Sequence, residues 1–434
     1  MVERTQVPEE YVLSNEVKWL RTENKRLFRV LRESMNKVAV GIVATYPPSE
    51  CGIATFTKDV VTAIAKYTPF SSHIVVAVKR EQEIEPYERI VRFQIPRDDR
   101  ASYAAAAKFL NDSDTDIVSV QHEFGIFGGE DGAYVLDLIE RLERPVAVTL
   151  HTVVSEPTPG QLRVMTGLAE LADMLVVMVR TGRRILIDNY GIDAHKITII
   201  QHGVPNVHRV SPMAVKRALG MADRHILSTF GLVNRGKGIE YAIEALPAII
   251  KKHPEVIYLV LGETHPGVRS FEGESYRNAL LETVNRLGLQ NYVRFNNRFL
   301  ALPELVRYLC ATDVYITPYL NRDQIVSGTL AYALGCGKAI VSTPYLYAEE
   351  VLADGRGLVV DFRSPEALAN AVNELLDNPA EREVMENLAY KYGRRTAWFN
   401  IAVDYLDLFR RLMLRHKRRA GMARQREDQV DVAT

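Results

Sequence analysis

The sequence predicts an α/β protein with two doubly wound domains. Short apolar runs recur along the chain, as strands buried on both faces of a parallel sheet require. Helical patterns separate many of these runs, which indicates strand–helix–strand units. A polar, proline-containing stretch at 205–222 divides the runs into two series. We therefore expect two Rossmann-like domains, over residues 37–205 and 206–395, with a hinge near this stretch.

The first series supplies the strands and helices of the N-terminal domain. It opens with a continuous apolar run at 38–43. Further strands are expected at 73–78, 117–120, 146–150, 175–179 and 197–200, and helices at 56–66, 101–110 and 134–142. The alternation of strand and helix predicts a doubly wound layer.

The second series begins at 226–230. Further strands are expected at 256–261, 293–295, 314–317, 339–342 and 358–360, and helices at 239–250 and 367–376. A last helix is expected over 396–414. The final segment, 415–434, begins with a basic stretch, which is typical of a solvated or disordered tail. Electrostatic attachment to a membrane is the alternative interpretation of this tail.

Residues 1–36 form a separate N-terminal extension. Residues 9–36 contain neither Gly nor Pro, and their heptad seam consists of Leu13, Val17, Leu20, Asn24, Leu27 and Leu31. An Asn at one core position is a known device for fixing register between paired helices. We expect self-association through this seam, packing on the chain's own domain, or contact of a basic face with anionic lipid. That face comprises Lys18, Arg21, Lys25, Arg26, Arg29 and Arg32.

The composition excludes several classes of protein. Among 434 residues, Lys and Arg number 54 and Asp and Glu number 54, which argues against nucleic-acid binding by bulk electrostatics. The three cysteines, Cys51, Cys310 and Cys336, are widely spaced, so a reducing compartment is expected. The first ten residues lack an apolar signal core, and no apolar run approaches about 20 residues. We expect a cytoplasmic protein, with peripheral membrane attachment as an addition.

Two candidate site segments follow strands of the first domain. Gly52, ahead of an expected helix, lets the backbone approach a ligand, and a helix N-terminus favours an anion. The segment that begins with Gln121, His122 and Glu123 resembles a pocket wall. His122 and Glu123 could act as acid and base or could bind sugar hydroxyls.

A single histidine, His151, ends the expected strand at 146–150. Its position at the carboxyl end of a strand favours a role in the site, although a lone histidine is more often a core residue. We expect no metal site, because no HxxxH or CxxC spacing is present.

Two segments of the second domain predict a phosphate site. Residues 231–238 resemble a P-loop, but Gly238 replaces the hydroxyl residue that would hold Mg²⁺. Lys237 can still bind a diphosphate without a metal. An expected helix starts near Ser327, and Gly328 permits close approach of an anion to its N-terminus.

Together these features resemble the family-4 glycosyltransferases of the GT-B fold, over about residues 38–414. Cys51-Gly52 matches the family's Gly-rich first loop, and His151 matches its early histidine. The segment 231–238 matches the family's G-R-L-x-x-x-K-G motif, and 324–332 aligns with its E-x7-E motif. The resemblance implies that the helix at 396–414 crosses back to the first domain.

The chain departs from the family pattern at three positions. Leu232 stands where the family has a phosphate-binding Arg, and Gln324 and Tyr332 stand in place of the two Glu residues. Arg235 or Arg298 could replace the missing Arg. Gln can hydrogen-bond a sugar hydroxyl, and Tyr can donate to a ribose oxygen.

The resemblance implies a retaining hexosyltransferase that needs neither a metal nor another cofactor. Lys237 and the amides of Ser327, Gly328 and Thr329 would stabilise the leaving diphosphate of a nucleotide sugar. His151 would contact the donor sugar. The other donor-binding residues implied are Gly52, Arg235, Gln324 and Tyr332, and the acceptor hydroxyl (of a sugar, lipid or protein) would lie near Gln121, His122 and Glu123. The competing hypothesis is a noncatalytic GT-B scaffold or regulatory binding protein.

Overall fold

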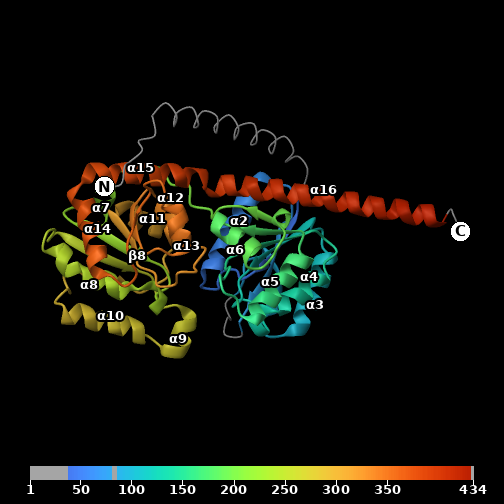
Figure 1. The fold of residues 1–434 in the computed structure, drawn as a ribbon, viewed down its shortest axis with the longest axis horizontal. Coiled ribbons are helices and arrows are strands. Elements are labelled where there is room, and N and C mark those ends of the chain that lie inside the picture. Colours follow the sequence, from blue (N-terminus) through green and yellow to red (C-terminus); the bar gives the residue numbers. More distant parts are fainter. Residues whose placement is uncertain (1–37, 81–85, 432–434) are drawn as a thin grey trace, which may run out of the picture.

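The computed structural model describes residues 38–80 and 86–431, which fold into two α/β domains (Figure 1). The N-terminal sheet has seven strands in the order β3-β2-β1-β4-β5-β6-β7. They are Val40–Ala44 (β1), Ile74–Lys79 (β2), Val91–Pro96 (β3), Ile117–His122 (β4), Val146–Leu150 (β5), Met174–Val177 (β6) and Ile197–Ile199 (β7). Every neighbouring pair in this sheet is parallel.

The C-terminal sheet has six strands in the order β10-β9-β8-β11-β12-β13. They are His225–Phe230 (β8), Val256–Leu261 (β9), Val293–Asn296 (β10), Val314–Thr317 (β11), Ala339–Ser342 (β12) and Leu358–Val359 (β13). These strands are also parallel, so the carboxyl ends of each sheet share one edge. The predicted fold class, two Rossmann-like α/β domains, is confirmed.

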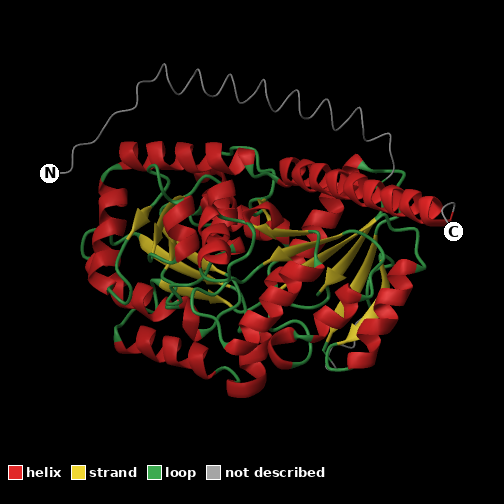
Figure 2. Cartoon of the chain, turned by 45° about the vertical axis from the view of Figure 1, so that its right-hand side comes forward, coloured by secondary structure: helices red, strands yellow, loops and turns green. Residues whose placement is uncertain are grey.

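Helices cover both faces of the sheets (Figure 2). In the N-terminal half they are Gly52–Tyr67 (α2), Arg100–Asn111 (α3), Tyr134–Glu140 (α4), Pro159–Leu171 (α5) and Arg180–Asp188 (α6). In the C-terminal half they are Pro212–Ala218 (α7), Ile239–Ile250 (α8), Pro266–Glu272 (α9), Ser275–Arg286 (α10), Leu302–Ala311 (α11), Gly328–Gly335 (α12), Leu346–Val351 (α13), Pro365–Asp377 (α14), Pro379–Arg395 (α15) and Trp398–Asp431 (α16).

Local sequence explains where several helices begin. Thr158 caps α5 by accepting from the Gln161 amide, and the Gln161 side chain accepts from the Thr158 amide, so the two form a capping box. Ser364 caps α14 in a similar way through the amide of Ala367. The strands between the helices are apolar because both their faces are covered: every residue of β1, β4 and β5 is buried.

Strand β3 and helix α7 were not expected from the sequence. The strand β3 was not predicted, because it lies at the sheet edge and alternates half-exposed with exposed residues such as Arg92 and Gln94, so it has no continuous apolar run. The stretch predicted as a hinge, 205–222, contains helix α7, which starts with Pro212 in its first turn.

The last helix is longer than predicted. We expected it to end at 414 and to be followed by a solvated or disordered tail, but α16 runs without a break from Trp398 to Asp431 (Figure 1, red). The reason is composition: residues 415–431 consist mainly of Arg, Lys, Ala, Met, Gln and Glu, which favour helix, and a helix already docked on the protein extends readily. The N-terminal seam predicted over 9–36 lies outside the described residues.

The chain passes between the domains at two adjacent points. Val204, on the way out of the N-terminal domain, forms a parallel bridge with Ala397, where the chain returns. After this return, α16 packs against α2 through Tyr405, Leu406 and Phe409, and the Tyr405 hydroxyl lies 3.1 Å from that of Thr149 in β5. Within the described residues, no helix combines the length and the apolar character that a membrane span needs.

Candidate functional site

Two adjoining pockets lie between the domains, where strands of both sheets end. The first has a volume of about 360 Å³ and the second about 830 Å³. Strand ends line both: Phe230 of β8 and Leu261 of β9 in the first, and Lys79 of β2 in the second. The lining residues that the two pockets share are Cys51, Gly52, Phe56, His202, His265, Val326 and Gly328.

The first pocket contains a lysine held by an aromatic ring. Lys237 ends the short 3-10 turn after β8, and its Nζ lies 3.8 Å from the centre of the Tyr319 ring. This contact is a cation–π interaction, which leaves the ammonium charge available. No carboxylate among the described residues forms an ion pair with Lys237. An anion in the pocket would therefore meet an uncompensated positive charge.

A helix N-terminus lies beside this lysine in the same pocket. Ser327 caps α12 by accepting from the Leu330 amide, which is the start that the sequence predicted. Ser327, Gly328 and Thr329 all line the first pocket. The Thr329 hydroxyl is held by those of Tyr319, at 2.6 Å, and Ser327, at 3.1 Å. The partial positive charge of the helix end thus adds to that of Lys237.

Glycines bring the surrounding loops close together. Gly262 has φ of 134°, and a Cβ there would lie 2.2 Å from the carbonyl oxygen of Gly231. Gly238 has φ of 60°, and a Cβ there would lie 2.1 Å from the carbonyl oxygen of Pro318. The hydroxyl residue that a P-loop has at this position would not fit, so the difference from a P-loop has a structural cause.

The histidine predicted to contact the donor sugar, His151, lines the second pocket. Its Nε2 donates to the Gln121 side-chain oxygen at 3.1 Å, while Gln121 donates to Ser119. Burial, together with the nearby His202 and His122, lowers the pKa of His151 to about 3. The imidazole is therefore neutral near pH 7 and suits hydrogen bonding better than proton uptake.

Phe56 joins the two pockets. Its ring makes edge-to-face contacts with His151 at 4.8 Å, His202 at 5.2 Å and Trp398 at 5.1 Å between ring centres. The Nδ1 of His202 lies 2.7 Å from the Gly203 carbonyl oxygen, so it is the protonated nitrogen. Burial lowers the pKa of His202 to about 4, and this second imidazole is neutral as well.

The segment predicted to bind the acceptor is only partly in the pocket. Glu123 lines the second pocket, but Gln121 and His122 line neither. Both lie within β4 and are fully buried, and His122 stacks on Phe127 with its two ring nitrogens unpartnered. In this structure neither Gln121 nor His122 is exposed to an acceptor, because β4 continues through these residues instead of ending at Val120.

Arg235 does not reach the pocket either. Its guanidinium pairs with Glu272 at 3.2 Å and lies 5.5 Å from the centre of the Tyr276 ring. Arg298 pairs with Glu304 on the surface. Neither arginine lines the pockets, so neither replaces the family's phosphate-binding Arg in this conformation, and the side chain at that position, Leu232, is apolar.

Gln324 and Tyr332 line the first pocket, yet both polar groups are engaged inside the protein. The Gln324 amide donates to the Val326 carbonyl oxygen at 2.9 Å. The Tyr332 hydroxyl donates to the Asp59 carboxylate, in α2 of the other domain, at 2.5 Å. Tyr332 therefore links the domains, a role that the sequence did not suggest.

Several pocket residues were missed by sequence reasoning. Asn234, Glu263 and His265 line the first pocket beside Lys237. The apolar part of the wall comes mainly from the segment 299–305, through Phe299, Leu300, Leu302 and Leu305. The polar residues follow the strands that end at residues 230 and 261, and this position was the signal by which the sequence could have identified them.

The second pocket carries charged groups of both signs. Lys79, Arg80 and Arg269 line it, together with Glu50 and Glu123. Arg269 pairs with Glu263 at 3.3 Å and with Glu50 at 3.7 Å. Burial raises the pKa of Glu123, against the lowering effects of the Gly125 amide and of the nearby Arg80 and Arg97. This pocket can accept a polar molecule with anionic groups.

Two family models match adjacent parts of the chain. The model described as "Glycosyltransferase Family 4" matches residues 52–206, and that described as "Glycosyl transferases group 1" matches residues 224–378. Between them they cover most of both domains.

Curated relatives agree with this assignment. A D-inositol 3-phosphate glycosyltransferase of Corynebacterium urealyticum is 29% identical over 55% of this chain and 57% of its own length. The protein of the same name from Kineococcus radiotolerans is 27% identical over 63% of this chain and 67% of its own length. The chain thus matches little more than half to two thirds of these relatives.

Solved structures have the same fold. HepE of Anabaena, in complex with UDP, is 18% identical with a TM-score of 0.68, over 86% of this chain and 99% of its own. Sucrose-phosphate synthase of Thermosynechococcus elongatus is 16% identical with a TM-score of 0.70, over 87% and 99%. The two facing parallel-sheet domains define a GT-B protein. The chain belongs to the family-4 glycosyltransferases.

Proposed function

We propose that this protein transfers a hexose from a nucleotide-diphosphate sugar to a hydroxyl acceptor, with retention of anomeric configuration and without a metal. One observation carries the proposal: Lys237 and the N-terminus of α12 line the same pocket. Both favour an anion, and a diphosphate gains negative charge as the glycosidic bond breaks. HepE, solved with UDP and with UDP-glucose, has the same fold, which supports a nucleotide sugar as the donor.

The chemistry follows from the two pockets. The diphosphate lies against Lys237 and the amides of Ser327 to Thr329, which stabilise the charge of the leaving group. The donor sugar extends toward His151, whose neutral ring hydrogen-bonds a sugar hydroxyl. The acceptor occupies the second pocket beside Glu123 and gives its hydroxyl proton to a donor phosphate oxygen. This route needs no pair of catalytic carboxylates.

The charged residues of the second pocket limit the class of acceptor that it can bind. Lys79, Arg80 and Arg269 line the second pocket, which favours an acceptor with a phosphate or carboxylate group. Since several relatives are named D-inositol 3-phosphate glycosyltransferases, D-inositol 3-phosphate is the first acceptor to test, with unphosphorylated inositol as the control.

A binding protein without catalytic activity is the competing proposal. It is favoured by Leu232 in place of the phosphate-binding Arg and by the internal hydrogen bonds of Gln324 and Tyr332. One experiment distinguishes the two proposals. We would incubate the purified chain with a panel of UDP- and GDP-sugars in EDTA and follow release of the nucleoside diphosphate. A rise in melting temperature with no release at any sugar would support the binding protein.

Location and assembly are proposed from the sequence. A cytoplasmic protein that attaches to anionic membranes fits the exposed basic side chains of α16, such as Arg415, Lys417 and Arg418. Deletion of residues 1–36 tests self-association through the seam at 9–36. An unchanged molar mass in light scattering would contradict it, and vesicle binding lost with the deletion would favour the membrane role.

A further inference from the structure

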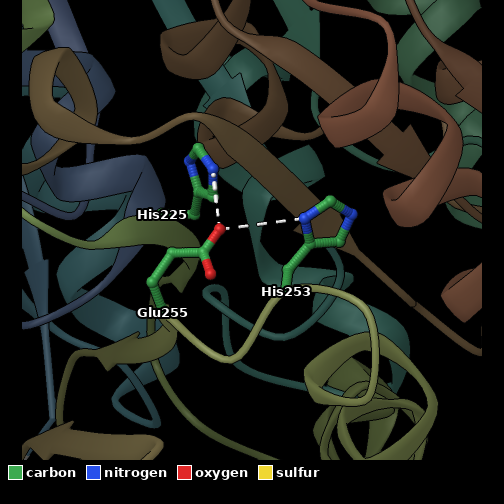
Figure 3. Close-up of side chains that lie close together, drawn as sticks. All are labelled: His225, His253 and Glu255. Atoms are coloured by element: carbon green, nitrogen blue, oxygen red, sulfur yellow. Dashed lines mark ion pairs between the residues drawn. The ribbon is translucent and has the colours of Figure 1, made fainter.

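Three side chains at the amino-terminal ends of β8 and β9, opposite the pockets, lie in positions suited to a metal ion. We propose that His225, His253 and Glu255 bind one Zn²⁺, or a similar transition-metal ion such as Co²⁺, with water completing the coordination. One nitrogen from each histidine and one carboxylate oxygen all lie within 4.8 Å of one another. Figure 3 shows both imidazole rings near the same Glu255 oxygen.

The backbone fixes where these three ligands start. His225 is the first residue of β8, and its amide donates to the Glu255 carbonyl oxygen at 3.2 Å, just before β9. The amide of His253 donates to Ile249 at the end of α8, and the Val256 amide donates to the His253 carbonyl oxygen. The side chains therefore gather because β8 and β9 are neighbours and the α8–β9 turn is short.

The distances from Glu255 to the two rings are near those around a tetrahedral ion. The Nε2 of His225 lies 3.1 Å from Oε1 of Glu255, and the Nδ1 of His253 lies 3.8 Å from the same atom. Metal–ligand bonds of about 2.1 Å at the tetrahedral angle place neighbouring ligand atoms roughly 3.4 Å apart. Small side-chain rotations bring the ligands to that spacing. Two imidazoles and one carboxylate are typical Zn²⁺ ligands, whereas Mg²⁺ and Ca²⁺ prefer oxygen alone.

Each ring also has a second carboxylate behind it. Oδ1 of Asp377, at the end of α14, lies 3.1 Å from Nε2 of His253, and Oδ2 of Asp313 lies 3.9 Å from Nδ1 of His225. Metal-bound histidines usually present their other nitrogen to such an acceptor, which orients the ring. A carboxylate thus faces the outer nitrogen of each ring, although neither nitrogen forms a hydrogen bond in this structure.

The proposed ion lies far from the pockets. The ligands lie at the amino ends of β8 and β9, and the pocket begins where these strands end, five or six residues further on and thus roughly 17–20 Å away at about 3.3 Å per residue. The ion would hold β8, β9 and α14 together instead of acting on the substrate. It therefore goes beyond the proposed function and is compatible with transfer in EDTA.

The test compares four full-length proteins: wild type, His253→Gln, Glu255→Gln and His195→Gln. The last removes an exposed histidine outside the cluster, while all four keep their cysteines. Each protein is stripped with EDTA, dialysed against Zn²⁺ and assayed for bound zinc and melting temperature. We expect wild type and His195→Gln to bind one Zn²⁺ more per chain than the other two, and only these two to melt at a higher temperature with Zn²⁺.

Equal zinc content in all four proteins, or none in wild type, would overturn the proposal and leave a cluster of histidine–carboxylate ion pairs. Glu255→Gln keeps the shape of a partly exposed side chain, so it reports on the ligand even if His253→Gln folds poorly. A tetrahedral Co²⁺ spectrum in wild type, absent from Glu255→Gln, gives a second readout. Nucleotide-sugar turnover, measured on the stripped protein, tests the transferase proposal separately.

Discussion

The two domains line the first pocket with different chemistry. From the N-terminal domain come Cys51, Gly52, Thr55, Phe56 and His202, none of which carries a charge near neutral pH. From the C-terminal domain come Lys237 and Glu263, together with the N-terminus of α12. Every formally charged lining residue of this pocket thus belongs to the C-terminal side.

This difference indicates which domain binds which part of the nucleotide sugar. A diphosphate is held by charge and by helix amides, and both lie in the C-terminal domain. A sugar ring is held by hydrogen bonds and apolar contacts, which the N-terminal side supplies without charge. The neutral His151 and His202 belong to this second kind of surface. The predictions below test this division.

The largest effect is expected at Lys237. In Lys237→Ala the leaving diphosphate loses the cation beside it, at a cost on the order of 3 kcal/mol, or roughly a hundredfold in kcat/KM. The melting temperature should hardly change, because the ammonium group forms no ion pair with a described carboxylate. Steady-state kinetics with the best donor measures the effect.

Arg235→Ala is the matched control for this variant. Arg235 lies two residues away and carries the same charge, but it pairs with Glu272 outside the pocket. Its turnover should equal that of wild type. If both variants lost activity equally, general surface charge and not the position of Lys237 would explain the result.

Tyr332→Phe tests the hydrogen bond that joins the two domains. It removes a hydrogen bond to the Asp59 carboxylate, and bonds to charged groups contribute about 1.5–3 kcal/mol. We expect a loss of this order in the free energy of unfolding, measured in urea, with α2 and α12 otherwise intact. Asp59→Asn in the same background should add little, since the bond is already gone; an additive loss would contradict a direct pair.

Acid pH tests whether the N-terminal side stays uncharged. Burial lowers the pKa of His122 to about 3, against 6.5 for the ordinary histidine. Its contribution to stability is complete above pH 6.5 and is lost as pH falls from 6.5 toward 3, by up to about 1.4 kcal/mol per pH unit. His122→Leu should flatten the pH dependence of unfolding free energy by this slope. An unchanged slope would mean that His122 is accessible to protons in the folded state.

The smallest effect is expected at Gly52, which faces both pockets. A Cβ there would meet no atom within 4 Å, so Gly52→Ala should leave both stability and activity unchanged. Gly52→Leu fills space that the ligand needs and should raise KM for the donor by about fivefold, or about 1 kcal/mol. Equal KM values for the two variants would place the donor elsewhere.

The sequence predicted the sheets well because buried parallel strands are uninterrupted apolar runs. Where a strand is half-exposed, as in β3, the run disappears and the prediction failed. The start of α12 at Ser327 was predicted because a cap is a local signal. The last helix was predicted too short, because the basic residues of its second half were interpreted as a tail and not as good helix formers.

The site was predicted only in part, because proximity to a strand end does not give the direction of a side chain. Lys237, Ser327 and His151 line the pockets as expected. Arg235 follows the same strand as Lys237 but turns toward Glu272, a partner 37 residues later. His122 fell inside β4 because the strand extends beyond its apolar run.

The return of α16 to the N-terminal domain has a consequence for biosynthesis. The apolar face of α2, with Phe56, Val60 and Ile64, is buried by residues of α16, which are translated only after the whole C-terminal sheet. The domain that is translated first therefore cannot complete its core until the second domain has also been translated. During that interval its unburied face is a surface for chaperones, and a ribosome stalled before residue 398 would release a chain whose first domain is unfinished.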